Sequence, residues 1–170
     1  SSAASDVYKR QAKGLPIVNL LKLEDGETIQ TIINARKEET AGKSFFFTTK
    51  QGVVKRTEVS EFNNIRQNGL RALNLKEGDQ LINVLLTDGQ DDIIIGTQSG
   101  YSVRFNEASI RNMGRSATGV RGVKLREEDR VVGASRIQDK QEVLVITENG
   151  YGKRTSATES VSYTHLTLPT

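Results

Sequence analysis

The sequence predicts an all-β fold, a partial β-propeller built from about three four-stranded blades of roughly fifty residues each. The first observation is that the phrase TKQGVVKR recurs as TQSGYSVR and TENGYGKR, with glycines 48 and 50 residues apart. The second is another phrase half a unit earlier, whose glycines lie 55 and 50 residues apart, at Gly14, Gly69 and Gly119. The third is that no long stretch has helical periodicity.

Each unit contains short runs rich in Val, Ile and aromatic residues, which are typical of β-strands. In the first unit the clearest hairpin spans residues 44–48 and 53–56. The second unit is predicted to contain strands at residues 70–75, 81–86, 92–97 and 102–105. The third is predicted to contain strands at residues 120–125, 131–137, 142–147 and 151–155. Because such a small sheet cannot bury both faces alone, neighbouring sheets must stack.

The last two strands of each unit are joined by a turn that ends in glycine. A three-residue hairpin loop places its last residue in the left-handed conformation, which glycine adopts without strain. This explains why Gly52, Gly100 and Gly150 recur while their neighbours vary. Gly69 and Gly119, in the second phrase, are also interpreted as turn glycines.

The repeated units extend over residues 12–159 and divide approximately into 12–66, 67–116 and 117–159. Residues 1–11 and 160–170 match no repeat, and we interpret them as non-native or disordered tails that pack poorly. An open array of blades exposes strand edges at both ends. A fragment without an independent fold therefore remains an alternative.

Catalysis and metal binding lack the residues that they need. The chain has no Cys, and its single His is His165, so neither a thiolate metal site nor a His-based triad can be assembled. Residues 42–44 resemble the end of a phosphate-binding loop, but Lys37 stands where its first glycine belongs. Asp91 and Asp92 are interpreted as part of a solvated turn. We expect no catalytic residue, no metal site and no cofactor.

The chain also lacks the signals of a membrane or secreted protein. No apolar run approaches the length that spans a bilayer, and the N-terminal residues lack the layout of a signal peptide. We therefore expect a soluble cytoplasmic protein with no membrane partner.

Basic residues gather where acidic residues are absent. Residues 111–126 include five basic side chains and no acid, in a chain whose net charge is only +3. At blade spacing such side chains would form one stripe, and nearby glycines would let the backbone approach a polyanion closely. Aromatic residues are sparse, so duplex DNA is favoured over stacked single strands. The predicted DNA-binding residues are Lys55, Arg56, Arg66, Arg71, Arg104, Arg111, Arg115, Arg121, Lys124, Lys153 and Arg154.

Several phrases in the same order closely resemble the family of DNA gyrase A C-terminal domains. They are KGLPIVNLL at residues 13–21, EFNNIR at 61–66, VRFNE at 103–107, MGR at 113–115 and TENGYGKRT at 147–155. The resemblance runs from about residue 12 to residue 159.

The resemblance implies a β-pinwheel, a six-bladed propeller variant whose blades exchange strands and whose basic rim wraps duplex DNA. It implies a parent protein associated with the chromosome, in a type II topoisomerase that introduces negative supercoils. The implied partners are duplex DNA, the remainder of gyrase A, and gyrase B. ATP and magnesium would act in other parts of that enzyme, so the fragment by itself is not an enzyme.

Two departures from the family pattern keep alternatives open. The chain contains only about three blades, and the family's glutamine- and arginine-rich box with paired glycines is missing, although residues 115–122 look like a degenerate counterpart. The similar domain of topoisomerase IV is therefore one alternative, while the phrases at Gly14 and Gly150 favour gyrase. The other is a protein-binding propeller whose Arg and Lys only solvate its rims.

Overall fold

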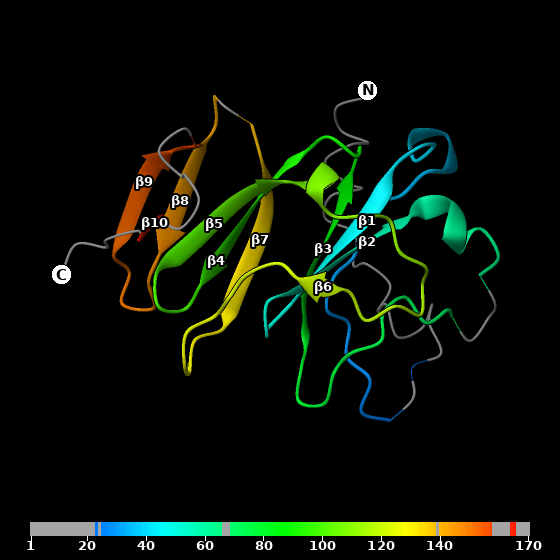
Figure 1. The fold of residues 1–170 in the computed structure, drawn as a ribbon, viewed down its shortest axis with the longest axis horizontal. Helices are drawn as coiled ribbons and strands as arrows, with labels where there is room; N and C mark the ends of the chain where they lie inside the picture. Colours follow the sequence, from blue (N-terminus) through cyan, green and yellow to red (C-terminus); the bar gives the residue numbers. More distant parts are fainter. Residues whose placement is uncertain (1–22, 24, 66–68, 139, 158–163, 166–170) are drawn as a thin grey trace, which may run out of the picture.

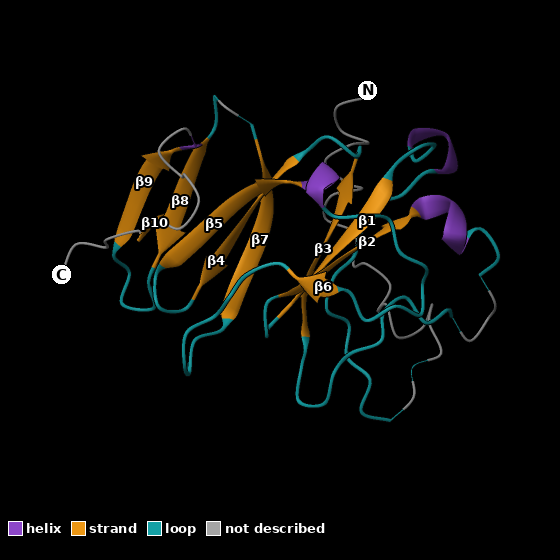
Figure 2. Ribbon diagram, in the orientation of Figure 1, coloured by secondary structure: helices purple, strands orange, loops and turns teal. Residues whose placement is uncertain are grey.

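In the part of the chain that the structure describes, the strands form two four-stranded sheets and a separate hairpin, side by side (Figure 1). The computed structural model describes residues 23, 25–65, 69–138, 140–157 and 164–165. Its strands are β1 (Ser44–Thr49), β2 (Val53–Glu58), β3 (Leu81–Thr87), β4 (Asp92–Thr97), β5 (Tyr101–Asn106), β6 (Val120–Arg121), β7 (Val131–Ile137), β8 (Glu142–Ile146), β9 (Gly152–Ser156) and β10 (Thr164–His165). Short 3₁₀ helices lie in the connections, at η2 (Lys37–Glu39), η3 (Val59–Phe62) and η4 (Glu107–Ser109) (Figure 2).

The two large sheets are each built around a central hairpin. The first sheet has the strand order β3-β1-β2-β6, the second has the order β10-β5-β4-β7, and β8 with β9 forms the third. Neighbouring strands run antiparallel throughout. The β8–β9 hairpin lies at one end of the molecule and the β1–β2 sheet at the other, with the second sheet between them (Figure 1).

Each large sheet takes a strand from the following sequence unit. β1 pairs with β3, and β4 pairs with β7. Both ladders shift register at the same point of the unit, between Thr48 and Thr49 and between Gly96 and Thr97. The blades therefore exchange strands. The divisions at 12–66, 67–116 and 117–159 mark repeats of sequence, whereas a sheet combines strands from successive repeats.

Two of the predicted strands are wrong. Residues 70–75 form no strand, and the strand expected at 120–125 is reduced to β6. The backbone polar groups there bond elsewhere: the carbonyl of Ala72 accepts from the Lys55 ammonium at 2.6 Å. The N–H groups of Gly122 and Val123 both donate to the carbonyl of Gly52. Bonds to a neighbouring hairpin thus replace a sheet ladder.

The core follows the alternation of β4. Ile93 and Ile95 are completely buried on one face, where they join a cluster with Phe46 and Val54 of the first sheet. Ile94 points to the other face and packs in a second cluster with Ile137, Ala157 and Val143. Successive side chains of a strand point to opposite faces, so β4 is covered on both sides. That double burial accounts for its unbroken run of isoleucines.

Two equivalent aspartates fasten the hairpin turns to the next unit. Asp79 Oδ1 accepts hydrogen bonds from the N–H groups of Gln51 and Gln80, and Asp129 Oδ1 accepts from those of Ser99 and Arg130. Burial alone would raise the pKa of Asp129, but the hydrogen bonds that it accepts, from Ser99 and Arg130 among others, outweigh burial and lower the pKa. These contacts fix the position of each hairpin turn.

The recurring turn glycines behave as the turn chemistry predicts. Gly52, Gly100 and Gly150 have φ angles of 80°, 81° and 82°, so all three lie in the left-handed region. Gly69 and Gly119 also have positive φ, at 74° and 104°. The shared backbone conformation explains the recurrence of glycine at these points of the repeat.

The terminal segments differ in what the structure describes of them. Residues 1–11 lie outside the described residues. Within residues 160–170, only β10 is described, and it pairs with β5 through Thr164↔Ser102 and His165↔Tyr101. That pairing matches the position of β6 on β2, where Val120 and Arg121 face Val54 and Val53.

Candidate nucleic-acid interface

The predicted DNA-binding residues lie in three different environments. Lys55, Arg56 and Arg104 are buried or half-buried in the sheets. Arg71, Arg111, Arg115, Arg121 and Lys124 lie on connections beside the first sheet or at its edge. Lys153 and Arg154 are exposed on β9, and Arg66 lies outside the described residues. The predicted cations therefore do not form a single exposed stripe, because Lys55, Arg56 and Arg104 are buried or half-buried.

Lys55 lies on β2 with its side chain inside the protein. Its relative exposure is 0%, and its ammonium donates hydrogen bonds to the carbonyls of Ala72 at 2.6 Å and Arg115 at 2.5 Å. The same ammonium lies 5.4 Å from the centre of the Phe47 ring. Burial lowers the pKa of Lys55 from 10.5 to about 8, and the charge of Arg115 adds to the effect. This amine binds protein carbonyls and does not reach the surface.

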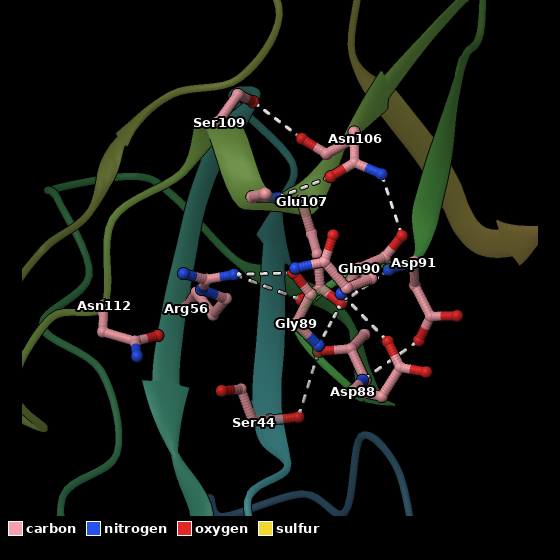
Figure 3. Close-up of polar contacts among 12 residues, drawn as sticks. Ser44, Arg56, Asp88, Gly89, Gln90, Asp91, Asn106, Glu107, Ser109 and Asn112 are labelled. Atoms are coloured by element: carbon pink, nitrogen blue, oxygen red, sulfur yellow. Dashed lines mark hydrogen bonds and ion pairs between the residues drawn. The ribbon is translucent and has the colours of Figure 1, made fainter.

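Arg56 belongs to a buried polar network around Glu107 (Figure 3). Glu107 is fully buried, and its Oε1 accepts hydrogen bonds from the N–H groups of Gly89 and Asp91. Arg56 Nη1 lies 3.8 Å from Glu107 Oε2 and 3.5 Å from the carbonyl oxygen of Gly89. The network joins β2 to the β3–β4 turn, so the Arg56 guanidinium serves the contact between sheets.

Arg104 pairs with an acid on the neighbouring strand. Its Nε and Nη2 both donate to Asp92 Oδ2, at 2.9 and 2.6 Å, and its Nη1 donates to the carbonyl of Ala157 at 2.8 Å. Hydrogen bonds from Arg104 and then from Asn106 lower the pKa of Asp92. The pair is partly shielded from solvent, and all three guanidinium nitrogens of Arg104 donate to protein acceptors.

A second group of cations remains on the outside, on three connections and on β6. We call it the basic connector surface and define it by Arg71, Arg111, Arg115, Arg121 and Lys124. Arg115 is half-buried and the others are exposed. Among the described residues, Arg71, Arg111 and Arg121 form no salt bridge with a carboxylate. Glu58 and Glu61 border one end of the surface, in a small pocket with Asn112 and Gly114.

Residues 111–126, which carry four of these five cations, include two glycines that press against β2. Gly119 has φ of 104°, and a Cβ there would lie 2.5 Å from the carbonyl oxygen of Val54. A Cβ at Gly122 would collide with the Val54 side chain. These glycines thus permit close approach to the protein's own strand β2, whereas the repeat pattern predicts that they let a polyanion approach the backbone. They hold Arg121 at the edge of the first sheet.

The third unit presents its cations differently. Arg154 Nε lies 3.2 Å from Glu142 Oε2, with both side chains at least half exposed. This pair occupies the position of Arg104 and Asp92 in the second unit, because Leu144 faces Arg154 as Ile94 faces Arg104. Solvent screens such an exposed pair, so Arg154 is available to another anion at little cost.

Two further exposed cations lie in the same acid-free runs and were not among the predicted binding residues. Lys76 follows the connection of Arg71, and Arg126 ends the acid-free run. The Arg126 guanidinium lies 4.1 Å from the centre of the Tyr101 ring, which is a cation–π contact. Their place in the acid-free runs is the sequence signal that indicates them.

The acidic side chains of the network in Figure 3 have protein partners. Oxygens of Asp88, Asp91 and Glu107 lie within 4.8 Å of one another. Asp88 accepts from the N–H of Gln90, and Asp91 accepts from the N–H of Asp88 and from Arg136. Asp88 and Asp91 thus accept from backbone donors and Arg136, whereas the buried Oε2 of Glu107 accepts no hydrogen bond from the described residues and lies 3.8 Å from Arg56 Nη1.

Among the described residues, no helix has both the length and the apolar character of a membrane span.

A family model described as "DNA gyrase C-terminal domain, beta-propeller" matches residues 4–36, 43–88, 91–138 and 141–159. The chain is 95% identical over 111 residues to the DNA gyrase A protein of Streptococcus pyogenes serotype M3, and 64% identical over 111 residues to that of Streptococcus pneumoniae serotype 4. These matches cover 65% of the chain but only 13% and 14% of the two relatives.

Two solved structures share the arrangement of strands. The C-terminal domain of DNA topoisomerase IV has a TM-score of 0.78 at 32% identity, covering 86% of this chain and 46% of that domain's chain. A DNA gyrase A C-terminal domain has a TM-score of 0.78 at 28% identity, covering 92% of this chain and 52% of the other. The strand exchange, the repeats and these matches agree. The chain therefore belongs to the DNA gyrase C-terminal domain family, with a β-propeller fold of the pinwheel type.

Proposed function

We propose that this chain binds duplex DNA through its basic connector surface, as part of the DNA-wrapping domain of gyrase. The contacts are made to the phosphate backbone and carry little sequence preference. Five cations in two acid-free runs of the sequence, residues 66–76 and 111–126, supply the electrostatic attraction, and the condensed counterions that they release from DNA supply affinity.

The observation that carries the proposal is the difference between the two sets of cations. Arg56 and Arg104 are each held by an acid of the protein. Arg71, Arg111 and Arg121 are exposed and have no such partner among the described residues. A cation that only solvates a rim or supports the fold gains from a nearby carboxylate. A run of cations without an acid in the sequence suits a polyanionic partner.

A role in wrapping follows from the energetics of DNA. The duplex is stiff over roughly 150 base pairs, so curving a short segment costs several kcal/mol that phosphate contacts must offset. The basic connector surface of this chain offers only part of the phosphate contacts that wrapping needs. We therefore assign to the parent protein, and not to this chain alone, the wrapping of DNA and its use by gyrase, with gyrase B and ATP, to introduce negative supercoils. The cellular setting would be the bacterial cytoplasm, on the chromosome.

The test is binding of the chain to duplex DNA over a series of salt concentrations. If all five cations contact phosphates, the slope of log K against log salt should be about −4.5, with similar affinities for unrelated sequences. Absence of binding at low salt by the folded chain would reject the proposal and favour a protein-binding role. A strong preference for one DNA sequence would reject backbone recognition.

Topoisomerase IV is a second candidate for the parent enzyme, because its C-terminal domain matches this fold at 32% identity. The 95% identity to the gyrase A protein over 111 residues favours gyrase. A supercoiling assay would separate the two parents. Restoring the segment to gyrase A should support negative supercoiling with gyrase B, whereas a topoisomerase IV parent would relax or decatenate DNA without introducing supercoils.

A further inference from the structure

Lys55 occupies a position at which the fold itself does not require an amine. The recurring hairpin places Lys55 at the same point of the unit as Val103 in the second unit and Lys153 in the third. Val103 is buried in the core cluster, whereas Lys153 is exposed on β9. An apolar residue therefore suits the buried form of this position, and the lysine in the first unit needs another explanation.

The contacts of the Lys55 ammonium supply that explanation. Its two acceptors are the carbonyls of Ala72 and Arg115, which lie on two connections far apart in the sequence. Ala72 directly follows Arg71, so each tethered carbonyl lies at or next to an arginine of the basic connector surface. A direct backbone bond between these connections is the one from the Asn74 N–H to the Ala117 carbonyl, and at 3.4 Å it is long. The hydrogen bonds of the Lys55 ammonium, at 2.6 and 2.5 Å, are the shorter links between the two connections.

Burying an ammonium opposes folding unless its hydrogen bonds compensate. Burial lowers the pKa of Lys55 to about 8, which shows that the charged form is disfavoured relative to water. A valine would avoid this cost, as at Val103. What the lysine adds is a fixed distance between two arginine-bearing connections. Fixing side chains before binding reduces the ordering entropy that association would otherwise lose.

We propose that Lys55 is a positioning residue of the DNA-binding surface: its buried ammonium ties the Arg71 connection to the Arg115 connection, so that both arginines meet the phosphate backbone together. The inference rests on the proposed DNA binding. Lys55 acts through these two arginines and does not touch DNA itself, since its side chain is completely buried.

The test compares Lys55→Val with the unchanged chain. Valine is the residue that the second unit accommodates at this position, so the variant should remain folded; Lys55→Met, which fills more of the space, serves as the second variant. Both should bind duplex DNA about five- to tenfold more weakly and lower the salt slope by about one to two, although Lys55 makes no phosphate contact. Lys140→Met is the control for the loss of one positive charge, because Lys140 is exposed between β7 and β8 and lies outside the basic connector surface.

A double-mutant cycle with Arg71→Ala gives a readout that a loss of stability alone would not change. If Lys55 positions Arg71, the combined effect of Lys55→Val and Arg71→Ala on affinity should be smaller than the sum of their separate effects. Full additivity, or wild-type affinity and slope in a folded Lys55 variant, would overturn the positioning role while leaving DNA binding intact. No DNA binding by the unchanged chain would reject the proposed function, and the positioning role with it.

Discussion

Arg104 donates two hydrogen bonds to one carboxylate oxygen of Asp92, at 2.9 and 2.6 Å, across the two central strands of the second sheet. The third unit repeats the pair as Arg154 with Glu142, whereas the first unit has Ser44 in place of the acid. There the equivalent Arg56 turns to Glu107 instead. An arginine that recurs in all three repeats is thus used by the fold wherever it is buried.

Replacing Arg104 should therefore weaken the fold and leave DNA binding unchanged. Arg104→Met leaves the half-buried Asp92 without its partner and frees the carbonyl of Ala157, at a cost of about 2 to 3 kcal/mol. Chemical denaturation should show this loss, and DNA affinity of the folded fraction should remain at the wild-type value. A clear drop in affinity without a change in stability would place Arg104 in the interface.

The repeat and its turns could be predicted from sequence, because both depend on local chemistry. Positive φ at Gly52, Gly100 and Gly150 follows from the turn itself, which only glycine adopts without strain. Strand exchange could not be derived in the same way. Residues 70–75 and 81–86 each contain three leucines, yet only the second run finds a partner strand, β1. That choice is made by tertiary packing.

The candidate site likewise contains residues whose environment could be predicted from sequence and residues whose environment could not. The exposed positions of Arg111 and Arg121 agree with their acid-free run. Burial of Lys55 could not be foreseen, because the repeat alone places both a valine and an exposed lysine at that point. Its two carbonyl acceptors both lie in the second unit, so no local pattern in the sequence around Lys55 indicates them.

Arg121 offers the cleanest test of phosphate binding, because it is exposed and has no acidic partner among the described residues. Arg121→Ala should reduce the salt slope of DNA binding by about 0.9 and weaken binding equally for unrelated sequences. Lys140 is an exposed cation between β7 and β8 and outside the basic connector surface. Lys140→Ala therefore serves as the control and should change DNA affinity and the salt slope little. An effect confined to one DNA sequence would contradict backbone recognition.

Gly119 should tolerate no side chain. Its φ of 104° disfavours L-residues, and a Cβ would lie 2.5 Å from the Val54 carbonyl oxygen. We expect Gly119→Ala to destabilise the fold by about 2 kcal/mol or more and to displace the connection that carries Arg121. Gly133→Ala is the control, because a Cβ there meets nothing within 4 Å. Equal unfolding midpoints for the two variants would show that the connection does not press on β2.

The pKa of Lys55 makes stability depend on alkaline pH in a defined direction. Burial lowers this pKa from 10.5 to about 8, so between these values the unfolded chain holds a proton that the folded chain has released. The free energy of unfolding must then rise with pH between about 8 and 10.5, by up to about 3 kcal/mol from Lys55 alone. Below pH 8 the contribution of Lys55 does not change with pH. Other groups titrate in the same range, so the measurement is the difference between wild type and Lys55→Val in urea unfolding from pH 7 to 10.5. The wild type should gain stability relative to the variant as pH rises, and a difference independent of pH would show that the buried amine keeps its ordinary pKa.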